Sequence, residues 1–306
     1  MMKFQHKLTL FAAAAAVLMS ACAANPAPKT SDPAPSAAVL PSDSGTSAKW
    51  FTEPREFASG ENYQSSEYYL LNEQTNRHIY AIETKPTGIQ PGEKVPVVIY
   101  VHGQSGYADN FSAIYTRLVK ENIAAFSFEC CGGNKSGAKS EGSKLFPANY
   151  TSRMTDLETV LTKVKTLDYV DTDHIFLFGE SYGGVVSSLT AITHNEIPGI
   201  ILLSTGISDT MMGHETDDLT YLPEYDYDDP LEAIKGYQGD VICFNGQQDF
   251  AHDAGENQIA QYNQRESGSA VFYSLENSDH SFSALSEEAK EFLIQTMQDF
   301  ILEHSA

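Results

Sequence analysis

The chain has 306 residues, of which 42% are hydrophobic, and its 41 acidic and 19 basic side chains give a formal net charge of −22. This length fits one large globular domain preceded by a processed N-terminal region. Nucleic-acid binding needs a basic surface that neutralises phosphates, and no basic cluster occurs, so nucleic-acid partners are excluded. Neither a His-Glu-x-x-His nor a Cys-x-x-Cys spacing occurs, so we expect no metal and no cofactor.

The first 21 residues have the pattern of an export signal. Lys3 and Lys7 precede an apolar run over residues 8–19, and small residues then lead into Cys22. The run is short for a transmembrane helix, and bacterial lipoprotein processing requires small residues directly before a cysteine. We therefore expect a lipoprotein signal peptide over residues 1–21 and a lipidated Cys22 that anchors the exported chain to a membrane of the cell envelope. The alternative is an ordinary secretory signal in which Cys22 has no role.

Residues 22–50 have the composition of a tether. They are rich in Pro, Ala, Ser and Thr and offer too little apolar surface to offset the entropy lost on ordering. We predict a disordered linker here, followed by one globular domain over residues 51–306.

From residue 67 onward, apolar runs of strand length alternate with segments of helical periodicity. This alternation predicts an α/β fold in which helices cover both faces of a mostly parallel sheet. Residues 67–72 and 78–83, joined by a polar turn, predict a hairpin that should form the antiparallel edge. Buried strands are predicted at residues 95–101, 123–128, 175–178, 200–203, 241–244 and 271–275. Helices are predicted at residues 111–120, 153–167, 185–193 and 287–302.

Residues 208–237 break the alternation with Met, Leu and Tyr among many acids, and we interpret them as a short cap.

The clearest motif is the pentapeptide Gly-Glu-Ser-Tyr-Gly at residues 179–183, between a predicted strand and a predicted helix. A serine presented on such a sharp turn has a strained backbone, and glycines on both sides relieve the crowding. The pentapeptide also occurs by chance as a glycine-rich connection without chemistry. Its context favours Ser181 as a catalytic nucleophile.

A serine hydroxyl needs a general base, and the base needs a carboxylate that holds it in one tautomer. Asp249 follows the strand predicted at residues 241–244 and is the favoured acid, with Asp253 as a competitor. His280 follows the last predicted strand and is the favoured base. His252 lies near Asp249, but on the acid loop, and we interpret it as structural.

An oxyanion hole needs two backbone N–H groups at the point where negative charge develops. The residue after the nucleophile, Tyr182, supplies the first. The second is expected from His102-Gly103-Gln104, directly after a predicted strand, where Gly103 permits a close approach and Gln104 is the donor.

These motifs, in this order along the chain, resemble the α/β-hydrolase superfamily over about residues 67–303. Within it, the chain looks most like small bacterial carboxylesterases of the feruloyl/cinnamoyl esterase and serine aminopeptidase-like group. The resemblance implies an α/β-hydrolase fold with the following site: Ser181 as nucleophile, His280 as base, Asp249 as its acid, and Gln104 and Tyr182 as oxyanion donors. The chain departs from the feruloyl esterase pattern in its short cap and in having Gln104 where an aromatic residue often follows His-Gly.

Cys130 and Cys131 are adjacent in the sequence. They line the pocket, form a strained vicinal disulfide, or are small buried thiols, the commonest case. We assign them no catalytic role.

The sequence therefore predicts a serine hydrolase that cleaves small carboxylic esters through an acyl-enzyme, with short-chain or small aromatic acyl groups. A peptidase or amidase with the same triad is one alternative. A surface-binding lipoprotein without catalysis is the other. The oligomeric state and the natural acyl and alcohol groups stay open at this stage.

Overall fold

The computed structural model describes residues 50–305 except 105, 133–137, 143–148 and 213–221. The predicted signal peptide, Cys22 and nearly all of the predicted linker lie outside the described residues. Within the described ranges, no helix is both long enough and apolar enough to cross a membrane.

The described residues form one nine-stranded sheet in the order β1-β2-β3-β5-β4-β6-β7-β8-β9. The strands are β1 (Arg55–Ser59), β2 (Tyr63–Asn72), β3 (Arg77–Pro86), β4 (Val95–Val101), β5 (Ala124–Phe128), β6 (Val170–Glu180), β7 (Gly199–Leu203), β8 (Asp240–Gly246) and β9 (Ala270–Leu275). The pairs β1–β2, β2–β3 and β3–β5 are antiparallel, and all later pairs are parallel. The predicted α/β class and every predicted strand are confirmed, but β9, predicted as a buried strand, is a partly exposed edge strand.

The predicted edge of the sheet is wrong, because β1 lies outside the hairpin of β2 and β3. Four of the five residues of β1 are exposed. An exposed edge strand carries no burial pattern that sequence periodicity can reveal.

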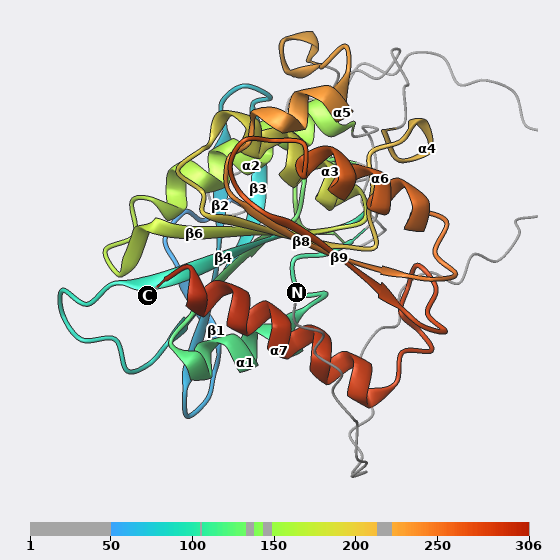
Figure 1. Cartoon of the computed structure of the whole chain (residues 1–306). Coiled ribbons are helices and arrows are strands. Elements are labelled where there is room, and N and C mark those ends of the chain that lie inside the picture. Colours follow the sequence, from blue (N-terminus) through green and yellow to red (C-terminus); the bar gives the residue numbers. More distant parts are fainter. Residues whose placement is uncertain (1–49, 105, 133–137, 143–148, 213–221, 306) are drawn as a thin grey trace, which may run out of the picture.

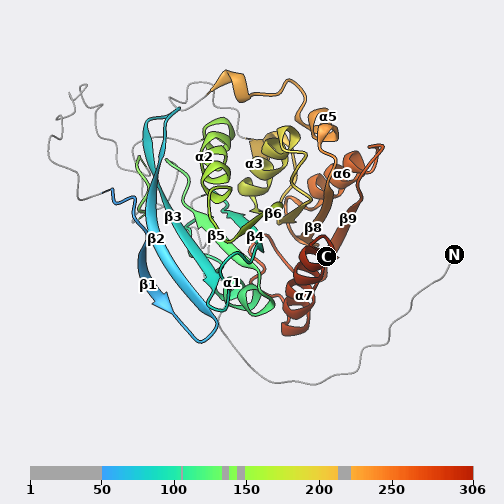
Figure 2. The ribbon, with the colours of Figure 1, turned by 90° about the vertical axis from the view of Figure 1, so that its left-hand side faces the viewer.

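Helices cover both faces of the sheet, as predicted (Figures 1 and 2). One face carries α1 (Ser112–Leu118) and α7 (Glu287–Glu303), and the other carries α2 (Tyr150–Val164), α3 (Tyr182–Thr190) and α6 (His252–Tyr262). Alternate residues of the central strand β4 serve the two faces: Val97, Ile99 and Val101 pack in the core under α2 and α3, and Val98 and Tyr100 in the core over α1 and α7.

Three helices differ from the prediction. Helix α3 begins at Tyr182, three residues before the predicted start at residue 185. Helix α2 begins at Tyr150, three residues early, because the Asn149 side chain caps it by accepting hydrogen bonds from the N–H groups of Thr151 and Ser152. Helix α6 was not predicted. Its sequence is mostly polar, and few of its residues are buried, so its periodicity is weak.

The predicted cap at residues 208–237 is described in part. It contains two single-turn helices, α4 (Asp209–Met212) and α5 (Pro230–Ala233), and the 3₁₀ turns η3 (Pro223–Tyr225) and η4 (Ile234–Gly236). Residues 213–221 lie outside the described part of the chain.

Candidate active site

Ser181 lies on the turn between β6 and α3, with φ 50° and ψ −120°. A positive φ is costly for a residue with a side chain, so the surroundings must hold it. The Ser181 N–H donates to the Leu203 carbonyl at 2.8 Å, and the Thr205 hydroxyl donates to the Ser181 carbonyl at 2.6 Å. A Cβ at position 183 would lie 2.0 Å from the Val101 carbonyl oxygen, so only glycine fits there. The turn therefore presents Ser181 in one fixed conformation.

The structure brings Ser181, His280 and Asp249 together. The Ser181 Oγ lies 2.9 Å from His280 Nε2, and His280 Nδ1 lies 2.7 Å from Asp249 Oδ1. A carboxylate only accepts hydrogen bonds, so Nδ1 carries the proton and Nε2 is left to accept from the serine hydroxyl. The Asp249 side chain is fully buried, whereas that of His280 is 31% exposed.

Backbone and aromatic contacts fix the acid and the base. Asp249 Oδ1 also accepts from the Ala251 N–H at 2.8 Å. The Ser204 hydroxyl donates to the His280 carbonyl at 2.9 Å. The Phe250 ring stacks on the imidazole with centroids 4.3 Å apart, although Phe250 itself is 64% exposed. The imidazole is thus held on its hydrogen-bonding edge and on one face.

Asn245, at the end of β8, connects the loops that follow β7 and β8. Its fully buried amide donates to the carbonyls of Thr205 at 2.8 Å and Ala251 at 2.9 Å, and its Oδ1 accepts from the Thr205 N–H at 3.1 Å. Because Thr205 also holds the Ser181 carbonyl, the nucleophile turn and the acid loop share one set of hydrogen bonds.

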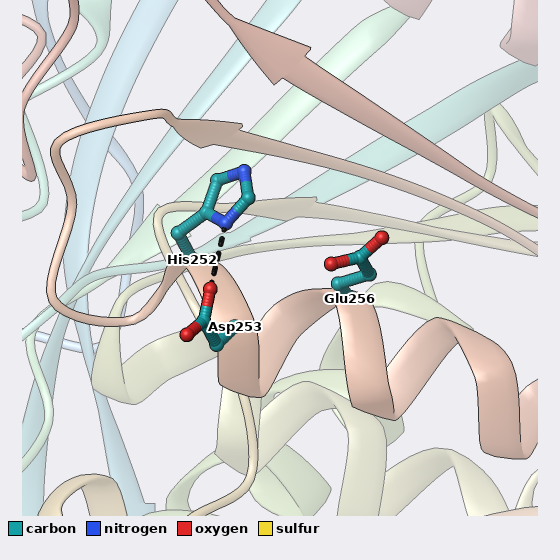
Figure 3. Close-up of side chains that lie close together, drawn as sticks. All are labelled: His252, Asp253 and Glu256. Atoms are coloured by element: carbon teal, nitrogen blue, oxygen red, sulfur yellow. Dashed lines mark hydrogen bonds and ion pairs between the residues drawn. The ribbon is translucent and has the colours of Figure 1, made fainter.

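The side chains of the competing residues have partners outside this triad. His252 opens α6 and is not on the acid loop as the sequence suggested, and its Nε2 lies 2.9 Å from the Ser274 hydroxyl. Its Nδ1 lies 3.1 Å from an oxygen of Asp253, whose side chain is fully exposed. Figure 3 shows both with Glu256 on the first turns of α6. These three residues have ligand atoms within 4.8 Å of one another, but exposed acidic groups commonly gather without a metal, and we assign none here.

The loop after β4 approaches the nucleophile closely. A Cβ on Gly103 would lie 3.1 Å from the Ser181 Cβ. The Gly103 carbonyl accepts hydrogen bonds from His102 Nδ1 at 2.6 Å and from the Gly106 N–H at 3.1 Å. In a trans peptide the C=O and N–H groups point in opposite directions, so these donors also fix the orientation of the Gln104 N–H. Tyr182 is the first residue of α3, the end at which a helix dipole favours negative charge.

His102 supports this loop, a role that its sequence context did not reveal. The ring is fully buried, and its Nε2 accepts from the Cys130 N–H at 2.9 Å. Burial, and secondarily the positive charge of Arg153, lowers the pKa of His102 to about 3, so the ring is neutral and donates through Nδ1. It connects the loop after β4 to the end of β5.

Cys130 and Cys131 are free, buried thiols, so the vicinal disulfide considered from the sequence does not form. Burial raises the pKa of Cys130 to about 12. Neither thiol is therefore a nucleophile at neutral pH.

Solved structures of other proteins resemble the fold of the described residues. The acetyl xylan esterase 1 of Thermoanaerobacterium is similar with a TM-score of 0.61 and 16% identity, over 83% of this chain and 88% of that one. Est1E from Butyrivibrio proteoclasticus with bound ferulic acid has a TM-score of 0.60 and 19% identity, over 77% of this chain and 98% of that one. This chain has the α/β-hydrolase fold.

Sequence comparisons find two further resemblances. A family model described as "Serine aminopeptidase, S33" matches residues 92–219, which include the loop after β4 and the Ser181 turn of the α/β-hydrolase fold. Dipeptidyl peptidase 8 of Homo sapiens and of Mus musculus is 24% identical over 172 residues. The match covers 50% of this chain but only 19% of those much longer proteins.

Proposed function

We propose that this chain is a serine hydrolase that cleaves carboxylic esters through an acyl-enzyme. The observation that carries the proposal is the continuous path of hydrogen bonds from Ser181 through His280 to the buried Asp249. In this arrangement a neutral imidazole accepts the serine proton, and the carboxylate stabilises the imidazolium that results.

The reaction has two halves. In the first, Ser181 Oγ attacks the ester carbonyl while its proton moves to His280 Nε2, and the N–H groups of Gln104 and Tyr182 stabilise the oxyanion. The tetrahedral intermediate collapses as His280 returns the proton to the leaving alcohol. In the second, His280 takes a proton from water as the oxygen attacks the acyl carbon. The C–Oγ bond then breaks, the carboxylic acid leaves, and His280 returns the proton to Ser181 Oγ. No cofactor takes part.

Two features support esters with short-chain or small aromatic acyl groups as the substrates. The structural relatives described above include an acetyl xylan esterase and a protein with bound ferulic acid. The segment between β7 and β8 is short and rich in acidic residues. A lipase that binds long acyl chains needs a larger apolar lid.

A serine peptidase or amidase is the second candidate. The matched family model is described as a serine aminopeptidase, and the curated relatives are dipeptidyl peptidases. An amide has a poorer leaving group than an ester, but the same triad can cleave it. Amide substrates therefore belong in the same experiment.

The test uses the full-length chain and its Ser181→Ala variant, with Ser59→Ala on the exposed strand β1 as a matched control. Substrates are p-nitrophenyl acetate, p-nitrophenyl butyrate, methyl ferulate and aminoacyl p-nitroanilides, and a fluorophosphonate probe labels the nucleophile. We expect ester turnover and labelling by the parent and the control, and a loss of about 10⁵- to 10⁶-fold in kcat for Ser181→Ala. Faster cleavage of the anilides than of the esters would favour the peptidase. A folded parent without labelling or turnover would favour a non-catalytic surface-binding lipoprotein.

We also propose that the chain is exported and anchored to the cell envelope by lipid on Cys22, on the basis of the pattern in residues 1–22. Lipidation partitions a protein into the detergent phase of a Triton X-114 separation. The parent should enter that phase when expressed in bacteria, and Cys22→Ala should stay in the aqueous phase. Equal partitioning of the two proteins would contradict the anchor.

A further inference from the structure

Arg153, in the first turn of α2, is a buried cation that forms no ion pair with a carboxylate of the described residues. Its side chain is fully buried and is among the largest such side chains in the protein. Among the residues that the structure describes, no carboxylate forms an ion pair with it, and its Nε has no hydrogen-bond partner. Its one hydrogen bond, from Nη1 to the Gly103 carbonyl, is long at 3.5 Å. Burying an unpaired charge is expensive, so its place in the fold needs a reason.

The guanidinium contacts one residue in each of the two segments that are expected to form the oxyanion hole. Besides the Gly103 carbonyl, it contacts the ring of Tyr182, with its central carbon 4.9 Å from the ring centroid. Gly103 and Tyr182 belong to the loop after β4 and the start of α3, which are the two segments expected to supply the N–H donors. The cation therefore contacts both segments from which the oxyanion donors are expected to come.

Asp156, a buried acid on the same face of α2, does not neutralise Arg153 by direct contact. Its Oδ1 accepts from the Asn72 amide at 2.7 Å, and its Oδ2 accepts from the Cys131 N–H at 2.7 Å. Burial raises the pKa of this carboxyl to about 6. The positive charge of Arg153 adds to the effect of burial in lowering the pKa of His102, so its field does reach the loop after β4.

We propose that Arg153 is a positioning residue for the oxyanion hole. Its charge attracts the Gly103 carbonyl, which helps to aim the Gln104 N–H at the substrate, and it adds positive potential behind the developing oxyanion. Both effects act on the transition state more than on the neutral ground-state ester, because negative charge is present only in the former. The inference rests on the proposed esterase activity.

The test compares full-length Arg153→Met, Arg153→Gln and Arg153→Lys with the parent. Arg117→Met, which removes an arginine paired with Glu291 on the surface, is the matched control. We measure kcat and KM with p-nitrophenyl acetate, and inhibition by a boronic acid that forms an anionic tetrahedral adduct with Ser181. For both neutral variants we expect kcat to fall roughly 10- to 100-fold with KM within about threefold, because the charge acts through a partly polarisable interior. Boronate affinity should fall by a similar factor, Arg153→Lys should recover much of the loss, and Arg117→Met should match the parent.

Several outcomes overturn the proposal. One is an unchanged kcat in either neutral variant with a native thermal melt. Another is an increase in KM alone, which would make Arg153 a substrate-binding residue. If Arg153→Met does not fold, the proposal is tested by Arg153→Gln and Arg153→Lys alone. A lysine variant with a kcat as low as that of the glutamine variant would show that the positive charge at this position does not affect catalysis. A parent that neither turns over nor is labelled by fluorophosphonate overturns the esterase proposal itself, whereas an active parent with unaffected Arg153 variants overturns this inference alone.

Discussion

The two sides of Ser181 are built differently. On one side, His280 and Asp249 follow two neighbouring parallel strands, β9 and β8, and contact each other directly, with the imidazole 31% exposed and the exposed ring of Phe250 stacked on it. On the other side, the loop after β4 is held by His102 and Arg153, which are both fully buried. We call the first the open side, because solvent reaches the imidazole of His280. We call the second the closed side, because the side chains of His102 and Arg153 that support it are fully buried.

This difference matches what each side would do in the proposed esterase. Proton transfer to a leaving alcohol and from a water molecule requires that solvent reach the imidazole. Stabilising an oxyanion instead benefits from fixed dipoles in a region without water, where they need no reorganisation. Burying the side chains that support the loop costs free energy, however, because a buried polar group without a hydrogen-bond partner loses its contact with water. Among the described residues, Arg153 Nε is such a group.

The largest effect should come from the open side. Asp249→Asn replaces the acceptor of the His280 Nδ1–H with a group that can donate, which favours the wrong tautomer. We expect kcat for p-nitrophenyl acetate to fall about 10⁴-fold while the fold stays intact. Asp253→Asn, in the exposed competitor, should leave kcat unchanged. A comparable loss in both variants would show that the acid has been assigned wrongly.

A smaller loss should follow from crowding the closed side. In Gly103→Ala the new Cβ would lie 3.1 Å from the Ser181 Cβ, so the loop must retreat by a few tenths of an ångström. We expect kcat to fall roughly 10²-fold, as for the loss of one oxyanion donor. Gly88→Ala, where nothing lies within 4 Å of the new Cβ, is the control. Full activity of Gly103→Ala would mean that the loop does not contribute to catalysis.

The buried imidazole of His102 should make the closed side sensitive to acid. Its pKa is about 3 in the folded protein against an ordinary value of 6.5, so the unfolded chain binds a proton over this range and the folded protein does not. The stability that His102 provides is complete above pH 6.5 and is lost as the pH falls from there toward 3. Relative to His102→Asn, the parent should lose about 3 kcal/mol of its unfolding free energy between pH 7 and pH 4. Urea titrations at both pH values measure this difference, and a constant difference would contradict it.

The smallest effect should come from Gln104→Ala. The proposed donor is the backbone N–H of this residue, and its side chain is exposed. Catalysis by backbone donation does not depend on the side chain, so kcat/KM for p-nitrophenyl acetate should stay within about threefold of the parent. A 10²-fold loss of kcat/KM would instead show that the side-chain amide of Gln104 is the donor.

The sequence predicted the open side well and the closed side poorly. Ser181, Asp249 and His280 each follow a strongly apolar strand, so their positions at one edge of the sheet are encoded locally. The roles of His102 and Arg153 depend on which distant segments pack over them. Cys130, a partner of His102, is 28 residues away along the chain, and Gly103 is 50 residues from Arg153. No local pattern distinguishes such a buried arginine from one on the surface of a helix.

Within the fold too, locally encoded elements were predicted and the others were missed. The buried strands were predicted because each contains a continuous apolar run, and most helices because their apolar residues recur at helical spacing. The exposed strand β1 and the polar helix α6 were missed because their places in the structure follow from the rest of the sheet rather than from their own sequences.

The hydrogen bonds of Asn245 limit the changes in length that the loop after β8 can tolerate. Its side chain joins the loop after β7 to the loop after β8 at fixed points, Thr205 and Ala251. An insertion of even one residue between Asn245 and Ala251 would break this connection and move Asp249 away from His280. The segment from Asn245 to Ala251 therefore has to keep its length if Asp249 is to stay beside His280.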